Sequence, residues 1–546
     1  MDGADLIKRY DELDARKGTY KAHIQEVADF INPAGANVIS HPALGAKHSR
    51  QIYDSWGMKC LTTFASGMYG NVMSAASQWF ELQAKDKTVA RRGDVTRWLR
   101  ECTERMHDCL NESNNGMSAP QVFSNLGWAG TAPIYIGEGE KTVLSMTAFS
   151  PARVAVMEDK DRMIDVVFRQ ERMSARRIKR LWPKTCSEKV NKACEKTPAQ
   201  EFDVVHAVYP REDAEMFFDR RVREMRTKMG ALNMPYASVY LERDGAHVLE
   251  EGGFEEFPYA VPRWEPRDEE EYGYSPGMRA LADIKMLNRM SEEDIKAQQL
   301  VVRPPLVAPM EMALSTIRLT PGGITYSKPG AKPEPLYVPD KYKLALEYEE
   351  QKRTVISAHF FMDFFAWLKE DDPQRTAYEI SKRAEQAQLH LGAALGRIQK
   401  EYLSRLLERA FWIMYRAGYL EPVPDALVGS GLSIQYTGRL AMAMKFGEVQ
   451  AAVQGMEIVG GISSFAPEAT DNIDSDKVVT GILRRLGVAE DFIRPEARVK
   501  EIRAARAQAQ QQAQLSAEMA EAAKAVPLNK AIEKGSPLEM LTGGGE

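Results

Sequence analysis

The chain has 546 residues, of which 44% are hydrophobic and 27% are charged, and its net charge is −5. This composition is typical of a folded globular protein and excludes the disordered and collagen-like classes, while the length allows about three to five modules. The chain also lacks the large basic surplus that tight DNA binding through many phosphate contacts would require, so if DNA is a partner the protein as a whole is not expected to grip it.

The first third of the chain is predicted to be largely helical. Apolar residues recur at helical spacing over residues 1–30, and Asn32-Pro33 ends that pattern. Two further helical stretches are expected at 50–82 and at 88–114.

The middle third is predicted to be an α+β module. From about residue 131 the hydrophobic period changes to two, which is typical of half-buried antiparallel strands. Ser174 is expected to cap a short helix, and Asp244-Gly245 lies between two alternating runs, which predicts a hairpin.

The next segment is predicted to be a pair of antiparallel helices with a small module at its tip. A proline-rich and acidic connector at 257–278 leads into a helix at about 277–301. Residues 303–339 hold eight of the 28 prolines with short β-like pieces, and a second helix is expected at 340–358.

The final third begins with an aromatic stretch, HFFMDFFAWLKEDDP, at 359–373. A helical pattern then runs from 374 to 418, on the order of 65 Å of helix. Residues 496–525 are rich in Ala and Gln and favour a helix, and the last twenty residues are expected to be disordered.

No residues with the spacing of a catalytic, metal or cofactor site stand out. A Walker-type phosphate loop, a Gly-x-Ser-x-Gly elbow and a His-Glu-x-x-His motif are all absent from the sequence. Five scattered cysteines without a Cys-x-x-Cys motif favour a reducing cytoplasm, and Cys102, His107 and Cys109 are interpreted as structural. No apolar run reaches about 18 residues, so no membrane span is predicted.

The order of these pieces resembles the portal, or head-to-tail connector, proteins of short-tailed bacteriophages. The segment IYDSWGMKCLTTFASGMYGNVMSAASQWFEL is similar to an early helix of that family that ends in a Trp-Phe pair. The long helix carries Thr376, Ala377 and Glu379 of the Thr-Ala-x-Glu motif, although the family usually has Thr or Ser where this chain has Tyr378. The connector before the first stem helix carries the central signature, here Pro258, Arg263, Trp264, Gly273, Pro276, Gly277, Leu287 and Asn288.

The resemblance implies a mixed α/β, predominantly helical subunit of the portal type, with the parts of such a subunit in chain order. These parts are the wing at 1–276, the first stem helix at 277–302, the clip at 303–339, the second stem helix at 340–358, the tunnel loop at 359–373, the long helix and crown at 374–495, a C-terminal helical segment at 496–525 and a disordered tail at 526–546.

The aromatic stretch lies where the resemblance places a loop that narrows the channel. A loop that faces DNA should offer few fixed cations, because each phosphate contact resists sliding. The candidate tunnel-loop residues are Phe360, Phe361, Asp363, Phe364, Phe365, Trp367 and Lys369. The alternative is that most of these aromatic side chains belong to the core. Lys341, Lys343, Lys352 and Arg353 are either channel cations on the stem or ordinary surface residues.

The partners implied are eleven further copies of the chain, or twelve in a 13-subunit ring, and the double-stranded DNA that passes through. The large terminase as packaging ATPase, a head-tail adaptor, and the capsid and scaffolding proteins would bind the ring at one capsid vertex of a virion made in the bacterial cytoplasm. No membrane partner and no cofactor are implied. A nucleic-acid enzyme with an unrecognised site and an internal scaffold or coat protein remain open as alternatives.

Overall fold

The structure, a computed structural model, forms two compact units, residues 1–444 and 445–546. It is mixed α/β and predominantly helical, as predicted. Among the described residues no helix is both long and apolar enough to cross a membrane. The described residues are 3–35, 37–39, 52–86, 88–211, 230–302, 306–307, 310, 334–335, 342–369, 391–429, 431–438, 452–462, 466, 468, 474–485, 494 and 496–525.

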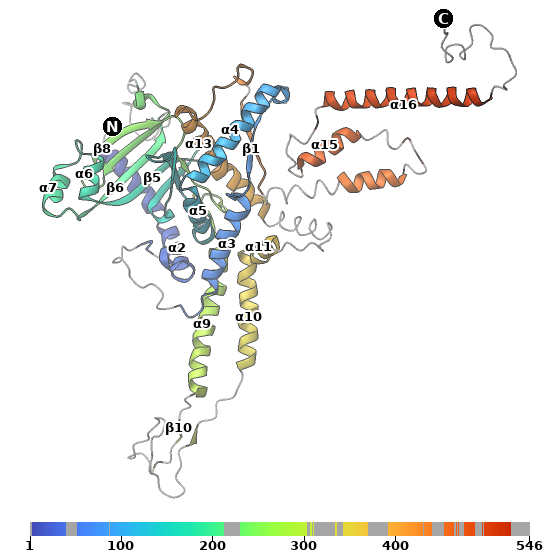
Figure 1. Ribbon diagram of the computed structural model, residues 1–546. Helices are drawn as coiled ribbons and strands as arrows, with labels where there is room; N and C mark the ends of the chain where they lie inside the picture. The colour runs from blue at the N-terminus through green and yellow to red at the C-terminus, as the bar shows by residue number, and fades with distance from the viewer. Residues whose placement is uncertain are drawn as a thin grey trace. The chain divides into compact units, whose positions relative to one another are not determined.

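The N-terminal region of the first unit is helical (Figure 1). Its helices are α1 (Gly3–Arg16), α2 (Gly18–Ile31), α3 (Trp56–Val72), α4 (Gly93–Glu112) and α5 (Asn115–Ala129), with short 3₁₀ turns η1 (Pro33–Gly35) and η2 (Val89–Arg91).

The single helix predicted at 1–30 is interrupted at Lys17. Its buried ammonium donates hydrogen bonds to the carbonyl oxygens of Ala152, at 2.9 Å, and Val154, at 3.1 Å. The interruption lets the two helices join different cores: Leu6 and Tyr10 of α1 pack on the large sheet, whereas α2 packs with the other helices.

The helix predicted at 50–82 ends at Val72, so the expectation for its last turns was wrong. Residues Phe80–Ala84 form strand β1, which pairs antiparallel with β12 (Leu432–Tyr436). The partner strand lies some 350 residues later in the chain, and a local hydrophobic pattern carries no information about such a pairing.

A five-stranded antiparallel sheet forms one end of the first unit. Its strands, in spatial order, are β4 (Val154–Glu158), β5 (Ile164–Ser174), β6 (Glu201–Pro210), β7 (Tyr236–Glu242) and β8 (His247–Phe254). A smaller sheet has the order β3 (Leu144–Ala148), β2 (Ile134–Glu138) and β9 (Tyr259–Ala260). The 3₁₀ turns η3 (Pro151–Arg153) and η5 (Gly230–Asn233) flank the large sheet.

Two local predictions in this region are confirmed. The hairpin between β7 and β8 turns at Gly245, whose φ of +89° is one that glycine adopts without strain. Ser174 caps α6 (Ala175–Leu181), and its hydroxyl accepts a hydrogen bond from the Arg177 amide. A second small helix, α7 (Glu188–Lys196), is capped in the same way by Ser187.

His206 of β6 is buried in the large sheet. One ring nitrogen lies 2.7 Å from the Tyr259 hydroxyl and the other 3.0 Å from the Ser238 hydroxyl, and the ring stacks on Tyr240. Burial, and then the charge of Arg169, lowers the pKa of His206 well below its usual value of 6.5. The imidazole is therefore neutral in the folded protein.

This neutral histidine predicts acid sensitivity of the fold. Below about pH 6.5 the unfolded chain takes up a proton that the folded chain refuses, so the free energy of unfolding should fall as the pH decreases. The His206→Gln variant should lose less stability between about pH 7.5 and about pH 5 than the wild type. Denaturant titrations at both pH values measure this difference, and His107→Gln, at a half-buried position on α4, is the control. An equal pH dependence of wild type and His206→Gln would contradict the prediction.

The largest hydrophobic core contains helices from the early part and from the late part of the sequence of the first unit. It contains Phe64 of α3, Phe123 of α5 and Leu281 of α9 (Pro276–Val302), together with residues of the helix at 391–416 such as Ile398 and Leu406. The part of the predicted long helix that is described therefore shares a core with the N-terminal helices. Residues 374–390 lie outside the described residues.

The long helix contains a π-helical turn, η7 (Gln399–Leu403), followed by α13 (Ser404–Arg416) and the short η8 (Asp425–Leu427). The described residues of the second unit include a helix at 452–462, α15 (Ser475–Arg485) and α16 (Glu496–Ala525). Asp476 of α15 forms an ion pair with Arg503 of α16. The range of α16 is the one expected to be helical, and the tail at 526–546 lies outside the described residues.

Candidate functional site: the stem helices and their anchors

Two helices, α9 and α10 (Tyr342–His359), run side by side away from the rest of the first unit (Figure 1). Beyond their far ends, β10 (Leu306–Val307) pairs antiparallel with β11 (Glu334–Pro335). We call α9 and α10 the stem pair. Most of the predicted clip, 303–339, lies outside the described residues.

Polar contacts run along the seam of the stem pair. The Ser291 hydroxyl donates to a Glu349 carboxylate oxygen at 3.0 Å, and the Lys352 ammonium lies 2.8 Å from the Asp283 carboxylate. Position 283 faces 352 and position 291 faces 349, so the two helices are antiparallel.

The root of the stem pair is tied to the start of α3. Arg353 of α10 lies 3.0 Å from the carboxylate of Asp54, and the Trp56 indole N–H donates to the Arg353 carbonyl oxygen at 3.2 Å. The Asn288 side-chain oxygen of α9 accepts the Tyr53 amide at 2.7 Å. Both stem helices therefore hold the same short segment of the body.

Two of the candidate channel cations have carboxylate partners in their own chain. Lys352 and Arg353 are engaged in ion pairs within their own chain, and Arg353 is also 3.1 Å from Glu349. These cations hold the seam and the root of the stem pair, and whether they also face a channel remains a prediction. Lys341 lies outside the described residues, as does the side chain of Lys343.

The segment 359–373, predicted as a loop, is mainly helical up to its described end. A turn at Phe360 and Phe361 joins α10 to α11 (Met362–Lys369). Phe361 has a φ of +56°, a left-handed conformation that is unusual for a bulky residue. The expected loop was wrong here because apolar residues such as Phe365 pack into the core and stabilise a helix.

The interpretation of the aromatic residues as core holds for two of the phenylalanines. Phe360 is 0% and Phe365 is 1% exposed, and both rings lie edge-on to the ring of Phe64. These two side chains cannot face DNA, so their assignment to a channel surface is corrected. The Phe365 ring fills the space over Gly67, where a Cβ would come within 2.5 Å of it.

The other candidate residues of this segment differ in exposure. Phe361 is partly buried against Trp264, Phe364 is half-buried and Asp363 is exposed. The side chains of Trp367 and Lys369 lie outside the described residues, so their predicted role remains a prediction.

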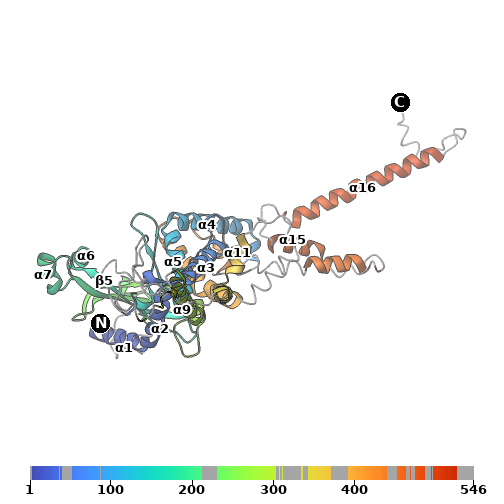
Figure 2. The ribbon, with the colours of Figure 1, turned by 90° about the horizontal axis from the view of Figure 1, so that it is seen from below.

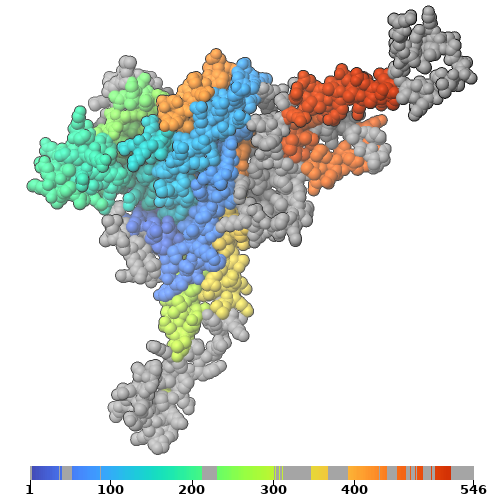
Figure 3. Space-filling view, viewed as in Figure 1, coloured from blue at the N-terminus to red at the C-terminus, as the bar shows by residue number. Residues whose placement is uncertain are grey.

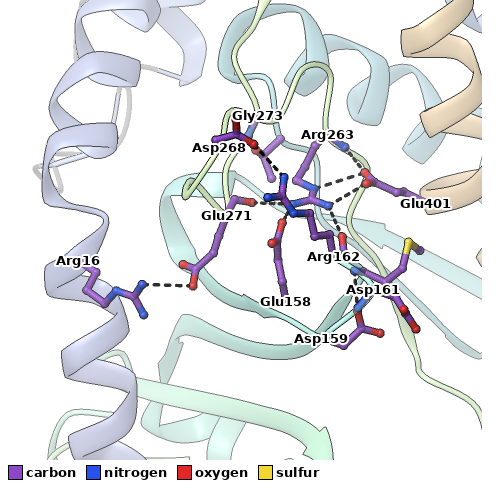
Figure 4. Close-up of polar contacts among 12 residues, drawn as sticks. Arg16, Glu158, Asp159, Asp161, Arg162, Arg263, Asp268, Glu271, Gly273 and Glu401 are labelled. Atoms are coloured by element: carbon purple, nitrogen blue, oxygen red, sulfur yellow. Dashed lines mark hydrogen bonds and ion pairs between the residues drawn. The ribbon is translucent and has the colours of Figure 1, made fainter.

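A buried arginine joins three distant parts of the first unit (Figure 4). The guanidinium of Arg263, which is 2% exposed, lies 2.8 Å from Glu401, contacts Glu158 and donates to the Arg162 carbonyl oxygen at 2.7 Å. Glu401 also accepts the backbone N–H of Arg263 at 2.8 Å. Burial alone would lower the pKa of Arg263, but the bonds to Glu401 and Glu158 raise it above its usual value.

Glu401 lies in the π-helical turn η7, an insertion that often marks a functional or strained position. The sequence analysis named Arg263 and missed Glu401 and Glu158. The sequence did contain one indication of Glu401: it is a single carboxylate beside Tyr402 and Leu403, on a side of the helix that is otherwise apolar. This pattern indicates a buried charge, but it does not show that Arg263 is the residue that pairs with it.

The parts of the chain that the structure describes contain no group of three or more His, Cys, Asp or Glu residues that could hold a metal ion. Cys102 and Cys109 are buried, whereas His107 is half-buried and its ring lies 3.2 Å from the Ser77 carbonyl oxygen. These positions agree with the structural interpretation of the three residues.

A family model described as bacteriophage head to tail connecting protein matches residues 4–493. The chain belongs to this family.

Two curated relatives extend over most of this connector. The portal protein of Salmonella phage epsilon15 is 30% identical, and the match covers 94% of this chain and 92% of the relative. The probable portal protein of Bordetella phage BPP-1 is 27% identical with the same two coverages. Among solved structures, a chain in the neck of an empty GTA particle is 11% identical with a TM-score of 0.34, covering 77% of this chain and 91% of its own, which is too low a score to establish a shared fold.

The signature residues of this connector surround the root of the stem pair. Arg263 and Trp264 are buried, and Gly273 packs so closely on Gly130 that a Cβ would lie 2.3 Å from its carbonyl oxygen. Gly277 likewise approaches the backbone of Gly127 at the first turn of α9. The signature therefore marks close contacts within the body and at the first turn of α9.

Proposed function

We propose that this connector assembles into a closed ring of twelve subunits, or thirteen in isolation, at one vertex of a phage capsid. Double-stranded DNA passes through the central channel during packaging and ejection. The large terminase and a head-tail adaptor dock on the ring, and capsid and scaffolding proteins surround it during assembly in the bacterial cytoplasm. The chain itself is proposed to perform no catalysis.

The single observation that carries this proposal is the family match over residues 4–493. The stem pair supports the proposal, because large apolar side chains on its surface are exposed to solvent in the single chain. The following are all more than 40% exposed: Met286, Ile295, Leu346, Tyr348 and Val355. Copies of the same chain packed side by side would cover them, and interfaces of this obligate kind bury roughly 2,000 Å² or more.

The charge of the chain fits a channel that lets DNA slide. Twelve copies at −5 each give a ring of −60, which disfavours a strong grip on a polyanion. The sequence contains no Walker-type loop, so the packaging motor is proposed to be a separate ATPase.

The assembly is tested by introducing charge at the exposed apolar positions of α10. Tyr348→Glu with Val355→Glu should abolish the ring and leave the subunit folded, because both side chains are exposed in the single chain. Native mass spectrometry should give a wild-type particle of about 736 kDa, twelve times 61.3 kDa, or about 797 kDa if the isolated ring has thirteen subunits, and a variant of 61.3 kDa. Circular dichroism verifies the fold of the variant.

The matched control is Arg97→Glu, which makes the same change of two charge units at an exposed position on α4. A control that also loses the ring would point to net charge rather than to the stem. A wild-type chain that is monomeric at every salt concentration would contradict the ring and favour a nucleic-acid enzyme, and assembly into shells would favour a scaffold or coat protein.

A further inference from the structure

The two small helices α6 and α7 carry a strong local excess of positive charge. Residues 175–197 hold eight Lys or Arg and two Glu, a surplus of six, so the rest of this acidic chain carries −11. We call this segment the basic tip. It lies at the end of the five-stranded sheet, away from α9, α10 and α11 in both ribbon views (Figures 1 and 2).

The basic tip is anchored to the sheet by uncharged and acidic groups, which leaves its cations free to point outward. The Trp182 indole N–H donates to Glu250 at 2.6 Å, and the Thr185 hydroxyl donates to the Leu249 carbonyl oxygen at 2.5 Å. Ile178 of α6 and Val190 of α7 are buried beneath. Figure 3 shows the tip as a lobe at the edge of the molecule.

Three of the eight cations are neutralised by neighbours. Arg177 pairs with Glu171, Lys189 with Asp244 and Lys192 with Glu188. Within the described residues the other five form no ion pair: Arg176, Lys179, Arg180, Lys184 and Lys196. Four of these five are exposed and Lys179 is half-buried, so their charge is available to a partner.

The residue types of the tip favour a polyanion over a protein partner. Protein interfaces are enriched in aromatic residues and depleted in Lys, whereas non-specific contacts to nucleic acid come from Lys and Arg on phosphates. The tip offers one large exposed apolar side chain, Leu181, and its Trp182 is buried.

We propose that the basic tip binds the phosphate backbone of double-stranded DNA without sequence specificity, at a surface remote from the stem pair. The choice of DNA among polyanions rests on the proposed function, in which double-stranded DNA is the cargo. The basic tip and the stem pair would then play opposite roles. The stem pair lets DNA slide through the channel, and the basic tip binds another stretch of the DNA.

The test measures binding of the full chain to a short fluorescent duplex of about 15 base pairs and arbitrary sequence, between about 50 mM and about 200 mM salt. The variant Arg176→Gln/Lys179→Gln/Arg180→Gln/Lys184→Gln should bind about tenfold more weakly or worse at the low salt concentration. Its plot of log affinity against log salt should be shallower by up to about 0.9 for each cation removed. Gln keeps helix propensity, so α6 should persist.

A matched control removes four exposed cations elsewhere: Arg97→Gln/Arg100→Gln/Lys141→Gln/Lys160→Gln. It should bind like the wild type. Two results would overturn the proposal. The first is an affinity of the wild type for the duplex that does not depend on the salt concentration. The second is unchanged DNA binding by the tip variant, which would leave an acidic protein surface as the partner of the basic tip. Native mass of the same samples reports the ring separately, so failure of the tip and failure of the proposed function are distinguishable.

Discussion

Replacing Arg263 by Met is expected to lower the free energy of unfolding by about 3–5 kcal/mol. The substitution removes the cation from between Glu401 and Glu158, and Glu401 is only 7% exposed. A buried carboxylate without its partner must either stay charged at high cost or take up a proton. Chemical denaturation measures the loss.

The double variant Arg263→Met/Glu401→Gln should be more stable than Arg263→Met alone, because it leaves one fewer uncompensated charge in the core. Glu158 is partly exposed and can be hydrated. The matched control breaks an exposed pair: Asp94→Asn removes the partner of Arg92 and should leave the free energy of unfolding nearly unchanged, because solvent screens the pair. A loss below about 1 kcal/mol for Arg263→Met would show that this buried network does not hold the three segments together.

Replacing Phe365 by Ala is expected to lower the free energy of unfolding by about 3–5 kcal/mol through the cavity it leaves. The ring is 1% exposed and packs on Phe64 and over Gly67. The comparison is Asp363→Asn, an exposed change on the same helix, which should stay within about 0.5 kcal/mol. A Phe365→Ala variant of unchanged stability would return this ring to the channel surface.

A second substitution tests the same packing from the other side. Gly67→Ala should destabilise by about 1–3 kcal/mol, because its Cβ would lie 2.5 Å from the ring of Phe365. Adding Phe365→Leu to Gly67→Ala should cost less than the sum of the two single changes, since the smaller side chain makes room for the methyl group. Strict additivity would contradict direct contact between the two positions.

Signals that depend on neighbours in the chain predicted their structures well. The Asp244-Gly245 dipeptide turns a hairpin, Ser174 caps a helix, and the apolar spacing of 277–301 forms α9. Each of these signals acts within a few residues, so the sequence expresses it directly.

Contacts between distant segments were predicted poorly. The strand at Phe80–Ala84 depends on Leu432–Tyr436, and the helix over 362–369 depends on a pocket that Phe64 and Gly67 provide. In the same way the ion pair of Arg353 depends on Asp54, about 300 positions earlier in the chain, which the sequence analysis did not name. A short apolar run looks the same in the sequence whether it forms a strand or a helix, and a charged residue looks the same whether it is paired or exposed.

The sequence by itself determined the order of the elements, the stem pair and the family signature, because periodicity, turn residues and motif spacing are local properties. Only the tertiary structure decided which charges are paired and which aromatic side chains are buried, since both depend on groups brought together by folding. The Arg263 network shows this division: the arginine could be read from its motif, but Glu401 and Glu158 became its partners only in three dimensions.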